Sequence, residues 1–318
     1  MKVVIAGGSG NVGLSLIRHL ATNQSDIFVL ARKNTFIENA KTVAWDGESL
    51  GAWVNTLNGA DVVINLAGRS VNCRYNNKNL SDMMTSRVNS TRVIGQAIAS
   101  VQNPPKIWLQ ASTATIYAHR YDKPNDEYTG ILGGDEPQAP RLWNESIAIA
   151  KAWEEELNNA ETPRTRKIAM RSAMTMSIDE GSVFRVLLGL ARKGLGGKLG
   201  NGNQFVSWIH EDDFAAAVMF LIQNETLQGA VNICSPNPLP QAQFMHELRL
   251  AAKVRFAINA PTWMVEIGTW LMKTESELVL KSRRVIPTRL LESGFQFRFP
   301  YWPDAATDLV NRTIKSTH

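Results

Sequence analysis

The amino-acid sequence predicts an α/β protein with a doubly wound parallel sheet and a smaller, α-rich C-terminal lobe. Apolar, strand-like runs alternate with segments of helical periodicity from Lys2 to Arg171, which is the pattern of βαβ units. A glycine-rich turn joins the first of these runs to the first helical segment. The alternation breaks down after about Ser172. Together these observations predict the Rossmann-type class.

The strands of the predicted sheet are short apolar runs bounded by turn residues. They are Lys2–Ala6, Asp26–Ala31, Thr42–Trp45, Asp61–Leu66, Lys106–Ala111 and Arg166–Arg171. Helical periodicity between them predicts helices over Asn11–Thr22, Leu80–Ser100 and Trp143–Asn158. Because crossovers between parallel strands are right-handed, we expect these helices to cover both faces of the sheet.

The later chain has a different pattern. The expected elements are a helix over Ser182–Lys193, a glycine-rich run over Gly194–Gly202, an apolar run over Phe205–His210, a helix over Asp212–Gln223 and a strand over Ala230–Cys234. From Pro261 onward we expect several short helices, punctuated by Pro287 and Gly294. This region is expected to pack as a lobe against the carboxyl edge of the sheet.

The strongest motif is the turn between the first strand and the first helix. Gly7, Gly10 and Gly13 have GxxGxxG spacing in the strand–turn–helix context of a dinucleotide site. Glycine permits the tight turn, the approach of a pyrophosphate and close helix–strand packing. The free N–H groups at the helix N-terminus suit phosphates. The residues expected to bind the cofactor here are Gly7, Ser9, Gly10, Asn11, Val12 and Gly13.

The end of the second strand indicates which dinucleotide is bound. Arg32 and Lys33 follow it with no nearby acid. A carboxylate here would hold the ribose hydroxyl of NAD, whereas a guanidinium can hold a 2′-phosphate. We therefore predict NADP(H), with residues 1–172 as its Rossmann domain and about 205–235 completing the sheet. Residues 173–318 are then mainly the substrate lobe.

Composition excludes several classes of function. The 34 basic and 29 acidic residues give a net charge of +5 that is spread along the chain, so no nucleic-acid partner is expected. The two cysteines have no metal-site spacing, and no metal is predicted. No cleavable signal and no apolar run of about 20 residues occurs, so we expect a cytoplasmic protein that does not bind a membrane.

Further motifs resemble the extended short-chain dehydrogenase/reductase superfamily. The match covers the glycine turn, Asn65-Leu66-Ala67-Gly68 and Ala111–Tyr117, the serine/threonine strand end. By this resemblance Asp46 meets the adenine ring, Leu66, Ala67 and Gly68 lie beneath the cofactor, Asn89 holds the family's helix asparagine position, and Thr113 is the substrate-facing hydroxyl.

Two later stretches narrow the resemblance. Leu195–Asp213 and Arg284–Pro300 resemble the epimerase-like branch with a DUF1731-type C-terminal segment, whose members are labelled nucleotide-sugar epimerases or cell-division inhibitors. The resemblance covers nearly the whole chain. It implies hydride transfer to or from a nicotinamide, with a tyrosine as the general acid/base and a lysine four residues later.

The expected catalytic residues depart from this pattern at one position. Lys151 fits the lysine that holds the nicotinamide ribose and lowers the tyrosine pKa, and Thr113 fits the polarising hydroxyl. Ile147 stands where the superfamily has tyrosine, although the resembled branch also tends to lack that tyrosine. Tyr117 could supply the phenol from the loop after Thr113, or it could be a packing aromatic.

Other candidates for the missing acid remain open. His119 and His210 are alternatives, although the acids after His210 favour a structural junction there, and Glu145 could be an acid or a helix-dipole partner. Arg87 and Arg171 could bind an anionic substrate such as a nucleotide diphosphate, or form salt bridges. Trp263 and Trp270, at helical separation, are expected to pack in the core or lobe.

Two functions are consistent with this sequence. The first is an NADP(H)-dependent oxidoreductase or nucleotide-sugar epimerase-like enzyme. Its substrate, a nucleotide sugar or another carbonyl compound, would lie between the sheet edge and the lobe, over Thr113 and near Lys151. The second is a non-catalytic regulatory or sensor protein that binds NADP(H). Lys151 fits both functions, because it could hold a ribose without transferring a proton.

Overall fold

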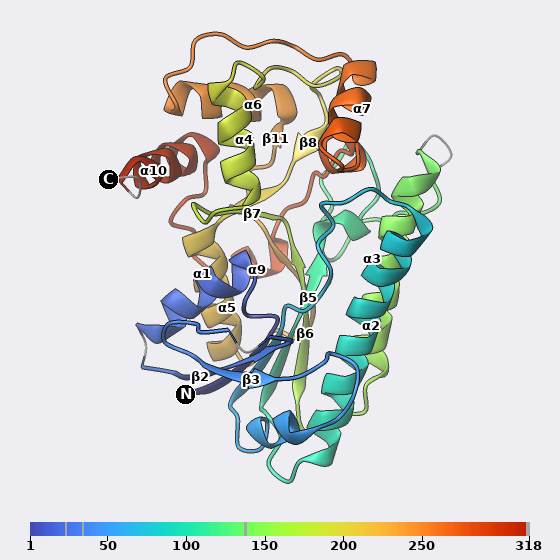
Figure 1. The fold of residues 1–318 in the computed structure, drawn as a ribbon, viewed down its shortest axis with the longest axis vertical. Coiled ribbons are helices and arrows are strands. Elements are labelled where there is room, and N and C mark those ends of the chain that lie inside the picture. The colour runs from blue at the N-terminus through green and yellow to red at the C-terminus, as the bar shows by residue number, and fades with distance from the viewer. Residues whose placement is uncertain (23, 34, 137–138, 316–318) are drawn as a thin grey trace.

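The computed structural model describes residues 1–22, 24–33, 35–136 and 139–315 (Figure 1). Within these residues the chain forms a seven-stranded sheet in the order β10-β6-β5-β4-β1-β2-β3, with every neighbouring pair parallel. The strands are β1 (Lys2–Ala6), β2 (Asp26–Ala31), β3 (Lys41–Ala44), β4 (Val62–Asn65), β5 (Ile107–Thr113), β6 (Arg166–Ser172) and β10 (Gly229–Ile233). The predicted Rossmann-type class is confirmed.

Helices cover both faces of this sheet, as Figure 1 shows. They are α1 (Asn11–Ala21) and α5 (Glu211–Gln223) on one face, and α2 (Asn77–Ser100) and α3 (Arg141–Asn159) on the other. Successive side chains of a strand point to opposite faces, so Val3 and Ile5 pack under α1 and α5 while Val4 packs under α2. A strand buried on both faces reads as a continuous apolar run, which is why β1 was predictable.

The C-terminal part of the chain forms a lobe at the carboxyl edge of the sheet (Figure 1). Its helices are α4 (Val183–Arg192), α6 (Gln241–Ala251), α7 (Thr262–Leu271), α8 (Glu277–Leu280) and α10 (Trp302–Lys315). Helix α9 (Thr288–Glu292) packs instead against β10, and its Leu290 belongs to the core of the main sheet. The core of the lobe is aromatic: Phe244 stacks on Trp302 with ring centroids 4.0 Å apart, and Trp208 lies edge-on to Trp302 at 5.0 Å.

In the N-terminal part of the chain, short 3₁₀ helices occupy Ala52–Thr56 and Ala114–Ile116.

Within the segment 205–235, expected to complete the sheet, β10 pairs with β6. The other strands of the later chain form two separate two-stranded sheets. One pairs β8 (Phe205–Val206) with β11 (Leu239–Pro240), and the other pairs β7 (Met174–Met176) with β9 (Trp208–His210). Because β7 begins two residues after β6 ends, its pair with β9 continues the chain directly from the main sheet.

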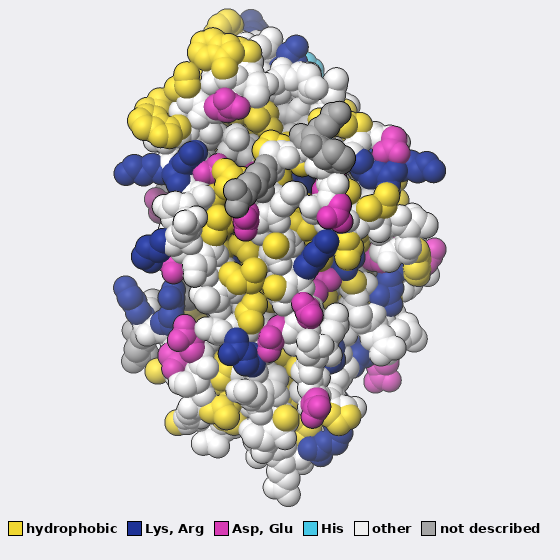
Figure 2. Space-filling model, turned by 90° about the vertical axis from the view of Figure 1, so that its right-hand side faces the viewer, with side chains coloured by type: hydrophobic (Ala, Val, Ile, Leu, Met, Phe, Trp, Pro, Cys, Tyr) yellow, Lys and Arg dark blue, Asp and Glu magenta, His cyan; other side chains and the backbone are white. Residues whose placement is uncertain are grey.

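Two tryptophans lie where the sequence did not place them. Trp263 and Trp270 are 62% and 64% exposed on α7, so the expectation that they pack in the core or lobe is wrong. Figure 2 shows hydrophobic side chains gathered at the upper end of the face that includes α7. Over the rest of that face, basic and acidic side chains are interspersed.

Candidate functional site

The glycine turn after β1 has the geometry of a phosphate cradle. Gly7 has a φ of +72°, and a Cβ on it would lie 2.8 Å from the Cα of Ala67. A Cβ on Gly13 would overlap the backbone of Gly8. Helix α1 begins at Asn11 without a side-chain N-cap or an acid in its first turn, among the described residues. Its first N–H groups are therefore free to bind an anion.

Basic residues stand at the edge of this cradle. Arg32 and Lys33 directly follow β2 and are both exposed. Asp46, after β3, is also exposed, and its carboxylate accepts N–H bonds from Glu48 and Ser49 at 2.9 Å. A further bond from the Ser49 hydroxyl lowers the pKa of Asp46 to about 2. Its oxygens therefore already close a tight turn.

The loop after β4 forms the floor beside the glycine turn. The Asn65 amide is buried, donates to Gln110 at 3.0 Å and accepts from the Ala67 N–H at 3.0 Å, which fixes the path of the loop. A Cβ on Gly68 would lie 3.2 Å from the Arg87 guanidinium carbon. The expected residue Asn89 accepts a bond from Arg92 at 2.6 Å on α2.

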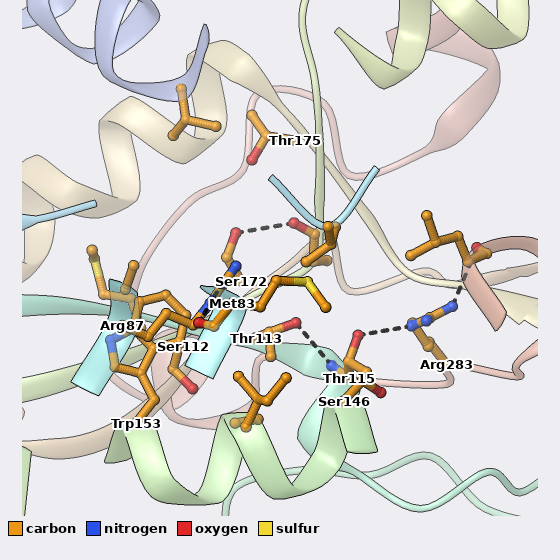
Figure 3. A pocket seen from close by; sticks show the side chains of 18 of the residues that line it. Met83, Arg87, Ser112, Thr113, Thr115, Ser146, Trp153, Ser172, Thr175 and Arg283 are labelled. Carbon is orange, nitrogen blue, oxygen red and sulfur yellow. Dashed lines mark hydrogen bonds between the residues drawn. The ribbon is translucent and has the colours of Figure 1, made fainter. Parts of the chain in front are cut away.

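A cavity of about 330 Å³ lies where the glycine turn, β5, β6, α2, α3 and α8 meet. Its wall includes Val12 from α1 and Leu66 from the loop after β4, both expected at the cofactor. It also includes Thr113 at the end of β5 and Arg87 from α2, labelled in Figure 3. Among the expected cofactor residues, Val12 and Leu66 thus line the same cavity as the expected substrate hydroxyl.

The Thr113 hydroxyl is oriented by the backbone that follows it. Its Oγ1 caps the 3₁₀ helix after β5 by accepting the Thr115 N–H at 3.1 Å (Figure 3). Because this bond uses Oγ1 as an acceptor, the hydroxyl proton is left to point elsewhere. A carbonyl or hydroxyl oxygen in the cavity could receive it.

Helix α3 presents to the cavity a different face from the one expected. Its lining side chains are Ser146, Ile149, Ala150 and Trp153, the i, i+3, i+4, i+7 stripe of a helix. Ile147 and Lys151 lie on the neighbouring stripe. A Cβ on Gly134 would lie 3.5 Å from Ile147 and 3.4 Å from the Lys151 Nζ. Ile147 and Lys151 were expected to face the substrate. Among the described residues, the cavity is lined instead by Ser146 and Ala150, which have the same spacing of four residues.

Tyr117 lies in a buried polar network outside the cavity. Its hydroxyl donates to Asn232 at 3.0 Å and accepts from Arg171 at 2.9 Å, and burial raises its pKa. Arg171 is paired with Glu154 through two bonds of 2.7 and 2.8 Å, and Glu154 accepts the Ser112 hydroxyl at 2.5 Å. This geometry supports the packing interpretation of Tyr117 and the salt-bridge interpretation of Arg171.

Each of the two histidine candidates accepts a hydrogen bond from a backbone N–H group. The Nδ1 of His119 accepts the Ser282 N–H at 2.7 Å, and burial lowers the pKa of this imidazole. His210 caps α5 by accepting the Asp212 N–H at 3.0 Å. The third candidate, Glu145, is half-buried and is not among the described residues that line the cavity.

Comparison with known families matches the chain to two descriptions. Residues 3–234 match the NAD dependent epimerase/dehydratase family, and residues 260–309 match DUF1731, a domain of unknown function. The chain belongs to the NAD dependent epimerase/dehydratase family. The expected resemblance is confirmed by both matches.

Individual members of the epimerase/dehydratase family resemble the whole chain. An epimerase family protein of Staphylococcus aureus (strain N315) is 29% identical over 310 residues, which are 97% of this chain and 99% of that protein. The structure of the human epimerase family protein SDR39U1 (isoform 2) with NADPH has a TM-score of 0.85 and 25% identity, covering 98% and 99% of the two chains. UDP-N-acetylglucosamine 4-epimerase from Bacillus cereus shares the fold, with a TM-score of 0.71, 16% identity and 99% coverage of both chains.

Several polar cavity residues of this family member were not singled out from the sequence. Among them are Tyr75 before α2, Ser146 on α3 and Glu277 on α8. The helical stripe of α3 could have indicated Ser146. No local pattern indicates Glu277, because it meets Ser146 from 131 residues away.

Arg87, on α2, is a cation in the wall of the cavity. Its guanidinium carbon lies 4.9 Å from the Trp153 ring centroid, one of its nitrogens donates to the Met83 carbonyl at 3.1 Å, and burial lowers its pKa to about 10. Among the described residues no carboxylate lies within ion-pair distance of it. Because burying an unpaired cation is unfavourable, an anionic ligand would stabilise this group.

Among the residues that the structure describes, no helix is both long enough and apolar enough to span a bilayer.

Proposed function

We propose that this family member is an NADP(H)-dependent oxidoreductase or nucleotide-sugar epimerase-like enzyme that acts by hydride transfer. The observation that carries the proposal is the single cavity shared by Val12 and Leu66, beside the glycine cradle, and by the Thr113 hydroxyl. A cofactor and a substrate oxygen could therefore meet in one cavity.

The residues at the cradle suit a dinucleotide. Gly7 and Gly13 let the turn pack closely against the backbone of Ala67 and Gly8, and the uncapped N-terminus of α1 offers N–H groups to a pyrophosphate. Arg32 and Lys33 would hold a 2′-phosphate, which favours NADP(H) over NAD(H). When bound, the cofactor supplies or accepts a hydride. NADPH in the structure of the human family member supports this assignment.

The charge of Arg87 in the cavity wall indicates the substrate class. Arg87 is a half-buried cation without a carboxylate partner among the described residues, so it would stabilise a bound anion. The Thr113 hydroxyl would donate to the reacting oxygen. A carbonyl compound or sugar that carries a phosphate or carboxylate fits both contacts. We propose such a compound as the substrate, with nucleotide sugars as one example.

A regulatory protein that binds NADP(H) without catalysis is the second candidate. The position of Lys151 beside Gly134 and the burial of Tyr117 favour it, because neither residue contacts the cavity as a catalytic tyrosine–lysine pair would. The polar residues of the cavity wall favour the enzyme over the sensor. A cavity built to hold only a cofactor would not need the acid Glu277 and the hydroxyls of Thr113 and Ser146.

Two measurements on the purified chain test the proposal. NADPH binding is measured by cofactor fluorescence, and NADPH oxidation is measured with a panel of nucleotide sugars and anionic carbonyl compounds. We expect turnover with at least one compound and a large loss of turnover, without loss of NADPH binding, in Thr113→Ala. The matched control is Thr307→Ala, an exposed threonine on α10. NADPH binding without turnover across the panel would favour the sensor.

A further inference from the structure

The cavity contains a buried acid that no expected role accounts for. Glu277, the first residue of α8, is 1% exposed and lines the wall near Thr113. Its Oε1 accepts the Ser146 hydroxyl at 2.5 Å. Its second oxygen, Oε2, is buried without a hydrogen-bond partner among the described residues. An orphaned carboxyl oxygen is costly when it is charged and much less costly when the group holds a proton.

Ser146 shares the cavity lining with this acid and is hydrogen-bonded to it. It lies on the α3 stripe that faces the cavity, in the stretch where the superfamily carries its tyrosine, and Figure 3 labels it beside Thr115. Its hydroxyl has two alternative acceptors, Glu277 at 2.5 Å and the Trp143 carbonyl at 3.0 Å. A single hydroxyl proton can serve only one of them at a time.

We propose that Ser146 is the catalytic hydroxyl that replaces the missing tyrosine, and that Glu277 is the positioning residue that supplies and takes up its proton. This inference rests on the proposed function. In the reducing direction, protonated Glu277 donates through Oε1 to Ser146 Oγ across the 2.5 Å contact, so the Ser146 hydroxyl proton is free to pass to the substrate oxygen. Ser146 Oγ keeps the proton from Glu277, which becomes a carboxylate and is reprotonated by a proton from solvent. In the oxidising direction the same two transfers run in reverse.

The charges around Glu277 set when it can hold the proton. Burial raises the pKa of Glu277, whereas Arg283 and Lys281, each 3.7 Å from its Oε1, limit that rise. Burial also lowers the pKa of Lys281 to about 8, so this cation is weakened on the alkaline side. Tyr75 faces the same cavity from the segment before α2, and burial and Glu277 both raise the pKa of its phenol.

Tyr75 is the alternative proton donor in the cavity. A phenol needs a nearby cation to lower its pKa into a useful range, as lysine does in the tyrosine–lysine pair. Here the main influences on Tyr75 raise its pKa. The carboxyl of Glu277 is therefore the better source of a proton, and Tyr75→Phe separates the two candidates.

The first test measures turnover and its pH profile with a compound that the wild type reduces. Glu277→Gln and Ser146→Ala should each lose about 100-fold or more in kcat, the usual contribution of general acid catalysis, with NADPH binding unchanged. The wild-type kcat for reduction should fall as pH rises through the pKa of Glu277, and Glu277→Gln should lose that limb. The matched control is Glu275→Gln, which removes a charge from a buried acid of the same segment that does not line the cavity.

The second test requires no turnover. Infrared titration of the protein should show a protonated carboxyl band that persists above the usual pKa of glutamate and disappears in Glu277→Gln. Absence of that band, or a wild-type rate and pH profile in Glu277→Gln, overturns the relay. So does a loss of activity confined to Tyr75→Phe. NADPH binding without any wild-type turnover instead overturns the proposed function, and the catalytic role of Ser146 with it.

Discussion

Replacing Gly7 by alanine tests whether the turn after β1 depends on backbone contact. The residue has a φ of +72°, a conformation that costs an L-residue about 1–2 kcal/mol. The new Cβ would lie 2.8 Å from both Cα and N of Ala67, so the loop after β4 must move. Overpacking of this kind costs about 1–3 kcal/mol. We therefore expect a loss of about 2–5 kcal/mol in unfolding free energy, together with a loss of NADPH affinity.

Gly59→Ala is the matched control for this substitution. Gly59 has nearly the same φ, +70°, but a Cβ on it would have no neighbour within 4 Å. It should lose only the conformational part, about 1–2 kcal/mol, and bind NADPH normally. Urea denaturation and cofactor fluorescence measure the two effects. Equal losses of stability in both variants, with NADPH binding retained in Gly7→Ala, would refute the close approach of the two loops as the reason for this glycine.

Three further substitutions test separate parts of the structure. Arg32→Asp should weaken NADPH binding at least tenfold more than NADH binding in fluorescence titrations, and equal losses would refute the 2′-phosphate assignment. Glu154→Ala leaves Arg171 buried without its partner and should lower the unfolding free energy by about 3–5 kcal/mol in urea; a loss below 1 kcal/mol would contradict the buried pair. A hydrogen bond to Asp212 raises the pKa of His19, so the stability that this imidazole contributes is fully present below pH 6.5 and is lost as pH rises through its raised pKa. The melting temperature of His19→Gln should therefore fall below that of the wild type at pH 6 and approach it at pH 9, and a gap independent of pH would exclude this linkage.

The strands and the cofactor turn were predictable because their signals are local. A parallel strand is buried on both faces and so reads as an apolar run, as in Lys2–Ala6, and the turn requires glycine at fixed positions. Helix α6 was not predicted, nor was the pairing of β8 with β11 and of β9 with β7. Both depend on how the lobe packs, for example on the stacking of Phe244 against Trp302, and not on local periodicity.

The reaction site was harder to predict because it is assembled from distant segments. Lys151 was selected because it fits the lysine position of the resembled superfamily, whereas packing of α3 turns Ser146 and Trp153 toward the cavity and leaves Lys151 beside Gly134. Glu277 reaches Ser146 from 131 residues along the chain. Only the tertiary structure brings these groups together, so spacing within one segment could not reveal them.

Transfer of deuterium from NADPH labelled at the nicotinamide C4 tests hydride transfer in this cavity most directly. With a compound that the wild type turns over, we predict that the label appears on the carbon next to the oxygen that Thr113 faces, and that Thr113→Ala greatly slows its appearance. Label that stays on the cofactor while NADPH remains bound, with every nucleotide sugar and anionic carbonyl tested, would contradict hydride transfer at this site.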